Sequence, residues 1–158
     1  VKSWGVSLYS DTELTEVLRV SEPQFVQAPV NLANRMFISD SIHSILSENS
    51  IQLHARSVFL QGLLIQPHKQ RHKQFNPWNY LFDEYAKTAS HWSVDTYQLA
   101  LGSILLSPRV HKIVIGVNSI DQLLALISFL NNVPTLPCIS DLPACDDPEL
   151  VDPRVWKV

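Results

Sequence analysis

Glycine is scarce in this chain, whose 158 residues include four glycines against ten prolines. The sequence contains no G-x-G-x-x-G fingerprint, which excludes the open dinucleotide-binding sheet that depends on that loop. The prolines predict fixed connections rather than flexible hinges. Cysteine is also rare, since Cys138 and Cys145 are the two present. We treat both as unpaired thiols and expect a reducing, cytoplasmic environment.

Long apolar runs and an excess of one charge are missing as well. No apolar run reaches the roughly 18 residues of a membrane-spanning helix, so we expect no membrane partner. The formal net charge is −3, which argues against a nucleic-acid partner. Hydrophobic residues make up 46 % and charged residues 17 % of the chain, and this composition is typical of a globular domain with its own core.

Short apolar stretches alternate with amphipathic ones, and this predicts strands that alternate with helices. A basic stretch within Gln61–Pro77 has no apolar period, so we expect an exposed loop there. The predicted strands are Lys2–Leu8, Phe25–Val30, Ile51–Phe59 and Val110–Val117. The predicted helices follow a capping box at Ser10–Glu13, cover Phe37–Leu46, Pro77–Ser90 and Ser93–Leu106, and follow a second capping box at Ser119–Gln122.

Strands that alternate with helices indicate right-handed βαβ units and a parallel sheet, which places the chain in the α/β class. The strands are nearly all apolar, as expected when both faces of a sheet are covered. Four such units are half of a (β/α)8 barrel of the TIM type, whose usual length is about 250 residues. We therefore expect residues 1–158 to form a single partial domain, with βα units over 1–132 and an irregular tail over 133–158.

Several stretches, taken in order, carry a family likeness: Trp4–Ser7 (WGVS), Phe25–Asn31 (FVQAPVN), Arg56–Leu64 (RSVFLQGLL), Leu99–Leu101 (LAL), Ile113–Leu123 (IVIGVNSIDQL) and Asp152–Trp156 (DPRVW). Together they resemble the aldo/keto reductases, which are NAD(P)H-dependent carbonyl reductases on a (β/α)8 barrel. The first stretch resembles the family's fifth strand and the fifth resembles its eighth strand and helix. The resemblance therefore implies the carboxyl-terminal half of the barrel, and the strand at the very start leads us to expect a piece of a longer protein.

The resemblance also implies what is missing. The family's catalytic Asp, Tyr, Lys and His come from strands two to four, so we assign no catalytic residue here and expect this chain alone to be inactive. The parent would be an oxidoreductase that acts on a small carbonyl substrate. The alternative is a non-catalytic half-barrel, or barrel domain, with a binding or assembly role in a larger protein.

The resemblance assigns the nicotinamide end of the cofactor to three residues. The position of Ser7 contacts the nicotinamide amide, and Gln27 can meet that amide with both a donor and an acceptor. Arg56 stands where the family usually has an aromatic side chain under the nicotinamide, and a planar guanidinium can stack there. The alternatives are that Ser7 and Gln27 satisfy a buried loop and that Arg56 pairs with a carboxylate at the rim.

The phosphate end is assigned to two segments. In the first, the family's loop covers the pyrophosphate with backbone amides; its residues are Ser57, Phe59, Gln61 and Gly62. In the second, a helix N-terminus faces the 2′-phosphate; its residues are Gly116, Val117, Asn118 and Gln122. The cationic side chains that select NADP in many relatives are missing, since Gln122 stands where an Arg is common. The cofactor is therefore NADP or NAD, held only in the complete barrel.

Four strands cannot close a barrel, and the outer edges of the first and last strands would be left unpaired. We expect either that two copies pair through these edges as a homodimer or that the rest of the barrel is present in the parent. We expect no metal site. His68 and His72 have a spacing that can bind a metal on a helix, but Pro67 favours a loop there and no third ligand is in view.

Overall fold

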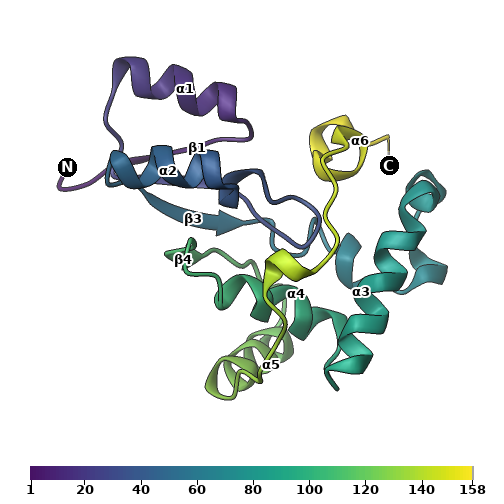
Figure 1. The fold of residues 1–158 in the computed structure, drawn as a ribbon. Helices are drawn as coiled ribbons and strands as arrows, with labels where there is room; N and C mark the ends of the chain where they lie inside the picture. Colours follow the sequence, from purple (N-terminus) through teal and green to yellow (C-terminus); the bar gives the residue numbers. More distant parts are fainter. Residues whose placement is uncertain (158) are drawn as a thin grey trace.

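The computed structural model describes residues 1–157 and contains a four-stranded parallel sheet (Figure 1). Strands that follow one another in the sequence are neighbours in the sheet, in the order β1-β2-β3-β4. Because every pair is parallel, the carboxyl ends of the strands meet at one edge of the sheet, which we call the rim. The strands are β1 (Gly5–Ser7), β2 (Phe25–Pro29), β3 (Gln52–Arg56) and β4 (Lys112–Ile113).

Helices alternate with these strands, as the sequence predicts. In Figure 1, α1 and α2 lie beside β1 and β3, whereas α3, α4 and α5 gather on the side of β4. The molecule is therefore an α/β fold with the strand order of a partial (β/α)8 barrel. The helices are α1 (Asp11–Val20), α2 (Asp40–Glu48), α3 (Asn79–His91), α4 (Thr96–Leu105), α5 (Ile120–Asn131) and the single turn α6 (Pro148–Val151).

Helices α1 and α5 begin where the sequence has a capping box. At α1, Ser10 Oγ accepts from the backbone N–H of Glu13 at 3.1 Å, and the Glu13 carboxylate accepts from the Ser10 N–H at 3.3 Å. At α5, Ser119 Oγ accepts from the N–H of Gln122 at 3.2 Å, but the Gln122 side chain accepts from the N–H of Asn118. The second box is therefore displaced by one residue towards the strand that precedes it.

The two faces of the sheet differ in polarity because side chains alternate along each strand. Ser7, Gln27, His54 and Lys112 pair in register across the four strands and share the more polar face. Ser7 and Lys112 are exposed, so the prediction of strands covered on both faces is wrong for this layer, because no element among the described residues lies over these two side chains. The opposite face is apolar, and its residues Val26, Ala28, Leu53 and Ala55 are at most 1 % exposed.

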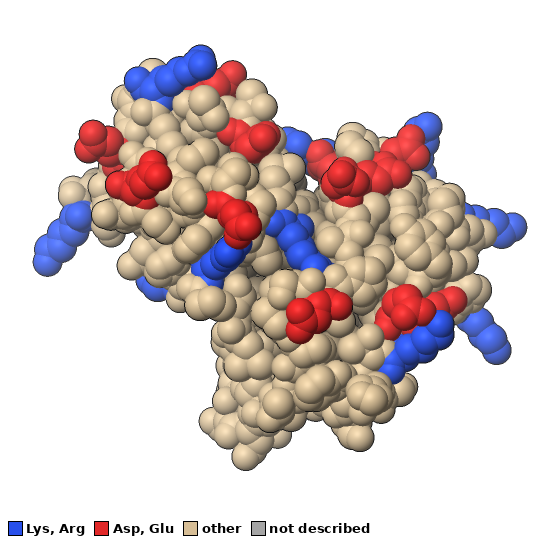
Figure 2. All heavy atoms as spheres, in the orientation of Figure 1, with Lys and Arg blue, Asp and Glu red and all other residues tan. Residues whose placement is uncertain are grey.

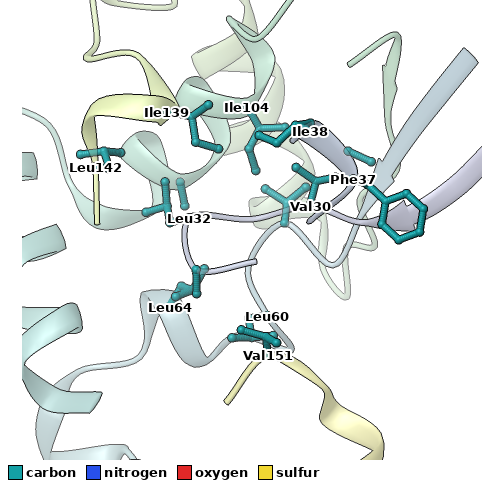
Figure 3. Close-up of a cluster of buried hydrophobic side chains, with 14 of the residues drawn as sticks. Val30, Leu32, Phe37, Ile38, Leu60, Leu64, Ile104, Ile139, Leu142 and Val151 are labelled. Atoms are coloured by element: carbon teal, nitrogen blue, oxygen red, sulfur yellow. The ribbon is translucent and has the colours of Figure 1, made fainter. Parts of the chain in front are cut away.

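The tail packs into the main core. Figure 3 shows Ile139 and Leu142 of the tail beside Leu32 from the loop after β2, and Val151 against Leu60 from the loop after β3. Two polar groups hold the tail as well, since Arg35 Nη2 and the Tyr85 hydroxyl both donate to the carbonyl oxygen of Pro143 at 2.8 Å. The tail is thus part of the domain, and the rim loops after β2 and β3 pack against it.

All four strands are shorter than the sequence predicts. The first covers Gly5–Ser7 rather than Lys2–Leu8, and the second ends at Pro29 rather than Val30. The third was expected to reach Phe59 but ends at Arg56, because Ser57 has a φ of 55°, outside the β region. The fourth was expected over Val110–Val117 but pairs with β3 over Lys112–Ile113 only. The edge of β4 that points away from β3 has no partner strand among the described residues, so β4 extends only as far as β3 can pair with it.

The loop and the tail contain more local structure than expected. Within Gln61–Pro77, short 3-10 turns cover Leu63–Ile65, His68–Gln70 and Lys73–Trp78, and α3 begins after the last of them. Within residues 133–157, helical turns cover Ile139–Asp141, Pro148–Val151 and Pro153–Val155. Asp147 and Asp152 cap the last two turns with side-chain hydrogen bonds, which explains why these turns form.

Among residues 1–157, no helix has both the length and the apolar character needed to span a bilayer.

Removing a buried tail side chain should destabilise the whole domain. Leu150 is 0 % exposed, so Leu150→Ala should lower the free energy of unfolding by about 2–5 kcal/mol. Val155 lies in the same tail but is 49 % exposed, so Val155→Ala should change it by about 0.5 kcal/mol or less. Urea unfolding followed by circular dichroism measures both. Equal midpoints for the two variants would show that the tail is not part of the core.

Candidate functional site

The rim brings the first three predicted residues onto adjacent strands. Ser7 ends β1, Gln27 lies opposite it on β2, and Arg56 ends β3. The backbone N–H of Leu8 donates to the Gln27 carbonyl at 2.9 Å, so the pairing continues past the end of β1. Ser7 is exposed and Gln27 is half-buried. Neither side chain makes a hydrogen bond within residues 1–157, so both are left for a ligand or for solvent.

Arg56 spans the rim from β3 to β1. Its Nη2 donates to the carbonyl oxygen of Leu8 at 3.2 Å, and its Nη1 lies 3.3 Å from Ser57 Oγ. Its guanidinium carbon is 4.0 Å from the centre of the Tyr9 ring. The expected alternative, a carboxylate partner for Arg56 at the rim, is not present among the described ion pairs. The guanidinium therefore lies over an aromatic ring instead.

The loop after β3 turns sharply over the next candidate residues. Ser57, Leu60, Gln61 and Gly62 have φ values of 55°, 47°, 55° and 86°, all in the left-handed region. Within residues 1–157, the backbone N–H groups of Phe59, Gln61 and Gly62 have no hydrogen-bond acceptor. Consecutive free N–H groups in left-handed and turn conformations form concavities that bind anions. This loop therefore has free backbone N–H groups that can bind an anion; the family resemblance predicts a pyrophosphate there.

Phe59 does not point its ring at open space in this loop. It stacks on Tyr97 of α4 with the ring centroids 4.8 Å apart and the planes 19° from parallel. The side chain of Phe59 thus anchors the loop to α4, which leaves its backbone as the group available to a ligand.

The segment before α5 fits a phosphate less well. Gly116, Val117, Asn118 and Gln122 are all exposed. The carboxamide of Gln122 accepts from the Asn118 N–H at 2.8 Å, so this side chain closes a turn. No hydrogen bond joins the segment to the other candidate residues in the part of the chain described. The structure brings the β1, β2 and β3 candidates together and leaves these four in a separate stretch.

Sequence reasoning missed Tyr9, Arg154 and His54. Tyr9 follows the GVS stretch by two residues, and its place after the first strand is the signal that could have found it. Arg154 lies in the tail and reaches the same ring, with its guanidinium carbon 3.9 Å from the centroid. No sequence signal links two residues so far apart.

His54 belongs to the same layer as Ser7 and Gln27. Its ring stacks on Phe25 with centroids 4.6 Å apart, it is 8 % exposed, and Nε2 has no hydrogen-bond partner. Burial lowers the pKa of this imidazole, and the nearby Lys112 and His111 lower it further. His54 is therefore kept neutral in the folded state.

Residues 1–157 hold no grouping of three potential metal-ligating side chains. His68 lies in a 3-10 turn, and His72 precedes the next turn, where its Nδ1 accepts from the Gln74 N–H at 3.4 Å. The two imidazoles therefore do not share a regular helix. Cys138 is exposed, Cys145 is half-buried, and both are free thiols.

Comparison with known proteins identifies the family. The family model for the aldo/keto reductase family matches residues 1–138. The chain belongs to the aldo/keto reductase family. The family and the partial barrel predicted from sequence are thus confirmed. A search of curated proteins finds no match.

Solved reductases share the fold. The aldo-keto reductase AKR11C1 from Bacillus halodurans matches in its holo and apo forms with a TM-score of 0.66 and 18 % identity over 85 % of this chain. The thermostable aldo-keto reductase Tm1743, solved with the inhibitor epalrestat, matches with a TM-score of 0.57 and 19 % identity over 80 % of it. The chain covers 46 %, 47 % and 42 % of these three structures, so it spans less than half of each solved reductase.

Stability should fall in mild acid because of His54. A folded-state pKa below the ordinary value of 6.5 means that the unfolded chain binds a proton first as the pH falls. The contribution of His54 to the free energy of unfolding is therefore complete at pH values above 6.5 and is lost as the pH falls below that value. His54→Leu should flatten the slope of urea midpoints between about pH 7.5 and about pH 5. Gln52→Leu, at an exposed position on the same strand, removes no titratable group and is the control, so it should keep the wild-type slope; an unchanged slope in His54→Leu would contradict the assignment.

Proposed function

We propose that this chain is the cofactor-binding half, strands five to eight, of an NAD(P)H-dependent reductase that acts on small carbonyl compounds in the cytoplasm. One observation carries the proposal: a flat guanidinium at the end of β3 leads directly into a loop with free backbone N–H groups. A nicotinamide dinucleotide needs both features, a planar partner for its ring and an anion site for its pyrophosphate. The family membership of the chain supports the same assignment.

Different residues of the rim would bind different parts of the cofactor. A bound nicotinamide cofactor supplies the hydride for carbonyl reduction. Ser7 and Gln27 would hold its amide, Ser7 with a hydroxyl and Gln27 with a donor and an acceptor. Arg56 would stack under the ring, and the amides of Ser57, Phe59, Gln61 and Gly62 would hold the pyrophosphate.

The choice between NADP and NAD depends on the segment before α5. Gly116, Val117, Asn118 and Gln122 present no cationic side chain to a 2′-phosphate. A helix N-terminus alone adds only a weak preference for an anion. We therefore expect little discrimination between the two cofactors at this end.

The proton for the carbonyl oxygen would come from elsewhere. The chain offers no positions that match the family's catalytic Asp, Tyr, Lys and His, and a carbonyl needs a general acid as well as a hydride. We propose that this chain alone is inactive. Four further βα units, from a longer polypeptide or from another chain, would supply the acid and close the barrel.

A second candidate function, assembly without catalysis, is favoured by the surface of α5. On the face that Figure 2 shows, no charged side chain appears on the lower part, where Figure 1 places α5. A groove of about 530 Å³ also runs between α4, β4 and α5. Exposed apolar patches of this kind mark interaction sites. The large exposed side chains of α5 are Ile120, Leu123, Leu124, Ile127 and Leu130.

The rim candidates Ser7, Gln27 and Arg56 and the loop at residues 57–62 all lie within this chain, so we now expect weak binding of the cofactor by the chain alone and tight binding only in the complete barrel. Titration with NADP⁺, followed by nitrogen–proton correlation spectra, tests the cofactor site. Shifts should be confined to the rim, with the largest in the loop at residues 57–62. Gly62 has a φ of 86°, and no atom lies within 4 Å of the place that a Cβ would take, so Gly62→Val should distort the loop through its backbone and weaken binding about tenfold. Val20→Ala, at an exposed position on α1, is the matched control. Shifts that avoid the loop, or equal binding by both variants, would contradict the proposal.

The same preparation should show no oxidation of NADPH with a simple aldehyde. Turnover by this chain alone would overturn the assignment of the acid to a missing half.

Sedimentation at several concentrations tests the open edges. Two copies related by a two-fold axis along the barrel would pair β4 of each with β1 of the other, which gives eight strands. We expect association that strengthens with concentration and is lost in Leu123→Lys/Ile127→Lys, whose side chains lie exposed on α5. Ser44→Lys, at an exposed position on α2, should leave association unchanged, because α2 joins β2 to β3 and lies at neither open edge. A wild-type monomer at every concentration would exclude the homodimer.

A further inference from the structure

The ring of Tyr9 lies between two guanidinium groups. Arg56 covers one side with its guanidinium carbon 4.0 Å from the ring centre, and Arg154 lies over the ring at 3.9 Å. Arg56 comes from the end of β3, Tyr9 from the loop after β1, and Arg154 from the tail. The stack therefore joins three parts of the chain at the rim.

Neither hydrogen bond of Arg56 fixes the plane of its guanidinium well. The bonds to Leu8 and Ser57 measure 3.2 and 3.3 Å, longer than the 2.7–2.9 Å typical of charge-assisted pairs. Its Nε is buried without a partner. The Tyr9 ring, 4.0 Å from the guanidinium carbon, is therefore a third contact that restrains this guanidinium.

Tyr9 is itself held in place by α1. Its backbone N–H donates to the Glu13 carboxylate, and the N–H of Ser10 donates to the same oxygen. The loop between β1 and α1 is thus fixed by the capping box, which limits the positions that the Tyr9 ring can take.

The tail holds Arg154 over the ring just as firmly. Arg154 Nε and Nη2 donate to the two carboxylate oxygens of Asp152 at 2.9 and 2.7 Å. These hydrogen bonds lower the pKa of Asp152, so the carboxylate stays charged. The residue before it, Val151, is buried against Leu60 in the core (Figure 3).

We propose that Tyr9 and Arg154 are positioning residues that hold the plane of the Arg56 guanidinium for a nicotinamide ring on its other face. A planar cation has two faces, and Tyr9 covers one of them. Within residues 1–157, Arg56 has no second aromatic partner. The flat side of a nicotinamide would complete the stack. This inference rests on the proposed function, because it takes Arg56 as part of the cofactor site.

Binding of two fragments of the cofactor separates positioning from general damage. Nicotinamide mononucleotide carries the ring, whereas adenosine diphosphate carries a pyrophosphate without it. Tyr9→Leu should raise the Kd of the mononucleotide about tenfold and leave that of adenosine diphosphate within twofold. Tyr9→Phe keeps the ring and should bind both as the wild type does. Arg154→Ala should show the same selectivity as Tyr9→Leu, with a smaller loss.

A structural readout keeps the inference testable without any ligand. The Arg56 guanidinium carbon lies over the Tyr9 ring at 4.0 Å from its centre, so we expect the ring current to move the signal of the adjoining Nε–H upfield. The shift should persist in Tyr9→Phe, shrink in Arg154→Ala and disappear in Tyr9→Leu. Urea midpoints of all variants establish that each is folded.

The outcomes separate the two proposals. An Arg56 signal that does not respond to Tyr9→Leu would overturn the positioning role, and so would an equal loss of both fragments. The wild type could bind neither fragment while the Arg56 signal responds as expected. In that case the proposed function is wrong, and the stack of Tyr9 with the two arginines has a structural role only.

Discussion

The pairing of β2 with β3 is the contact on which the rest of the structure depends. It joins five residues of each strand, whereas β1 contributes three residues and β4 two. The parallel register brings Ser7, Gln27 and Arg56 to one rim and places the loops after all three strands on the same side. A slip of one residue would turn Gln27 and His54 into the apolar core. The burial of Val26 and Leu53 on the other face opposes such a slip.

Much of this fold could be predicted from the sequence, because its signals are local. The capping box at Ser10–Glu13 and the apolar run over Phe25–Val30 identify α1 and β2 almost to the residue. The ends of β3 and β4 could not be predicted in this way. Ser57 leaves the strand through a left-handed backbone conformation, and Val114–Val117 has the composition of a strand but lacks a second partner strand among the described residues. Whether a segment such as this one has a second partner strand cannot be read from the residues around it in the sequence.

The candidate site also contains residues that the sequence identifies and residues whose contacts depend on distant parts of the chain. The family resemblance selected Ser7, Gln27 and Arg56, and the parallel register of β1, β2 and β3 brings these three residues to one rim. Gln122 was placed correctly on the helix, yet its side chain bonds to Asn118, a choice that composition does not reveal. Tyr9 and Arg154 were missed because a stack between residues 145 positions apart depends on how the tail returns over the rim.

That return explains why the tail and the rim form one unit. The carbonyl of Pro143 accepts from Arg35, which follows β2, and from Tyr85 of α3, so the tail is fixed from two sides before it reaches Arg154. Burial lowers the pKa of Arg35 and raises that of Tyr85, yet Arg35 stays charged and Tyr85 neutral near neutral pH, so both keep donating. Because the tail is closely packed, the place from which Arg154 reaches the Tyr9 ring is fixed as well. The geometry of the guanidinium at the end of β3 is therefore a property of the whole half-barrel, including residues near its carboxyl end.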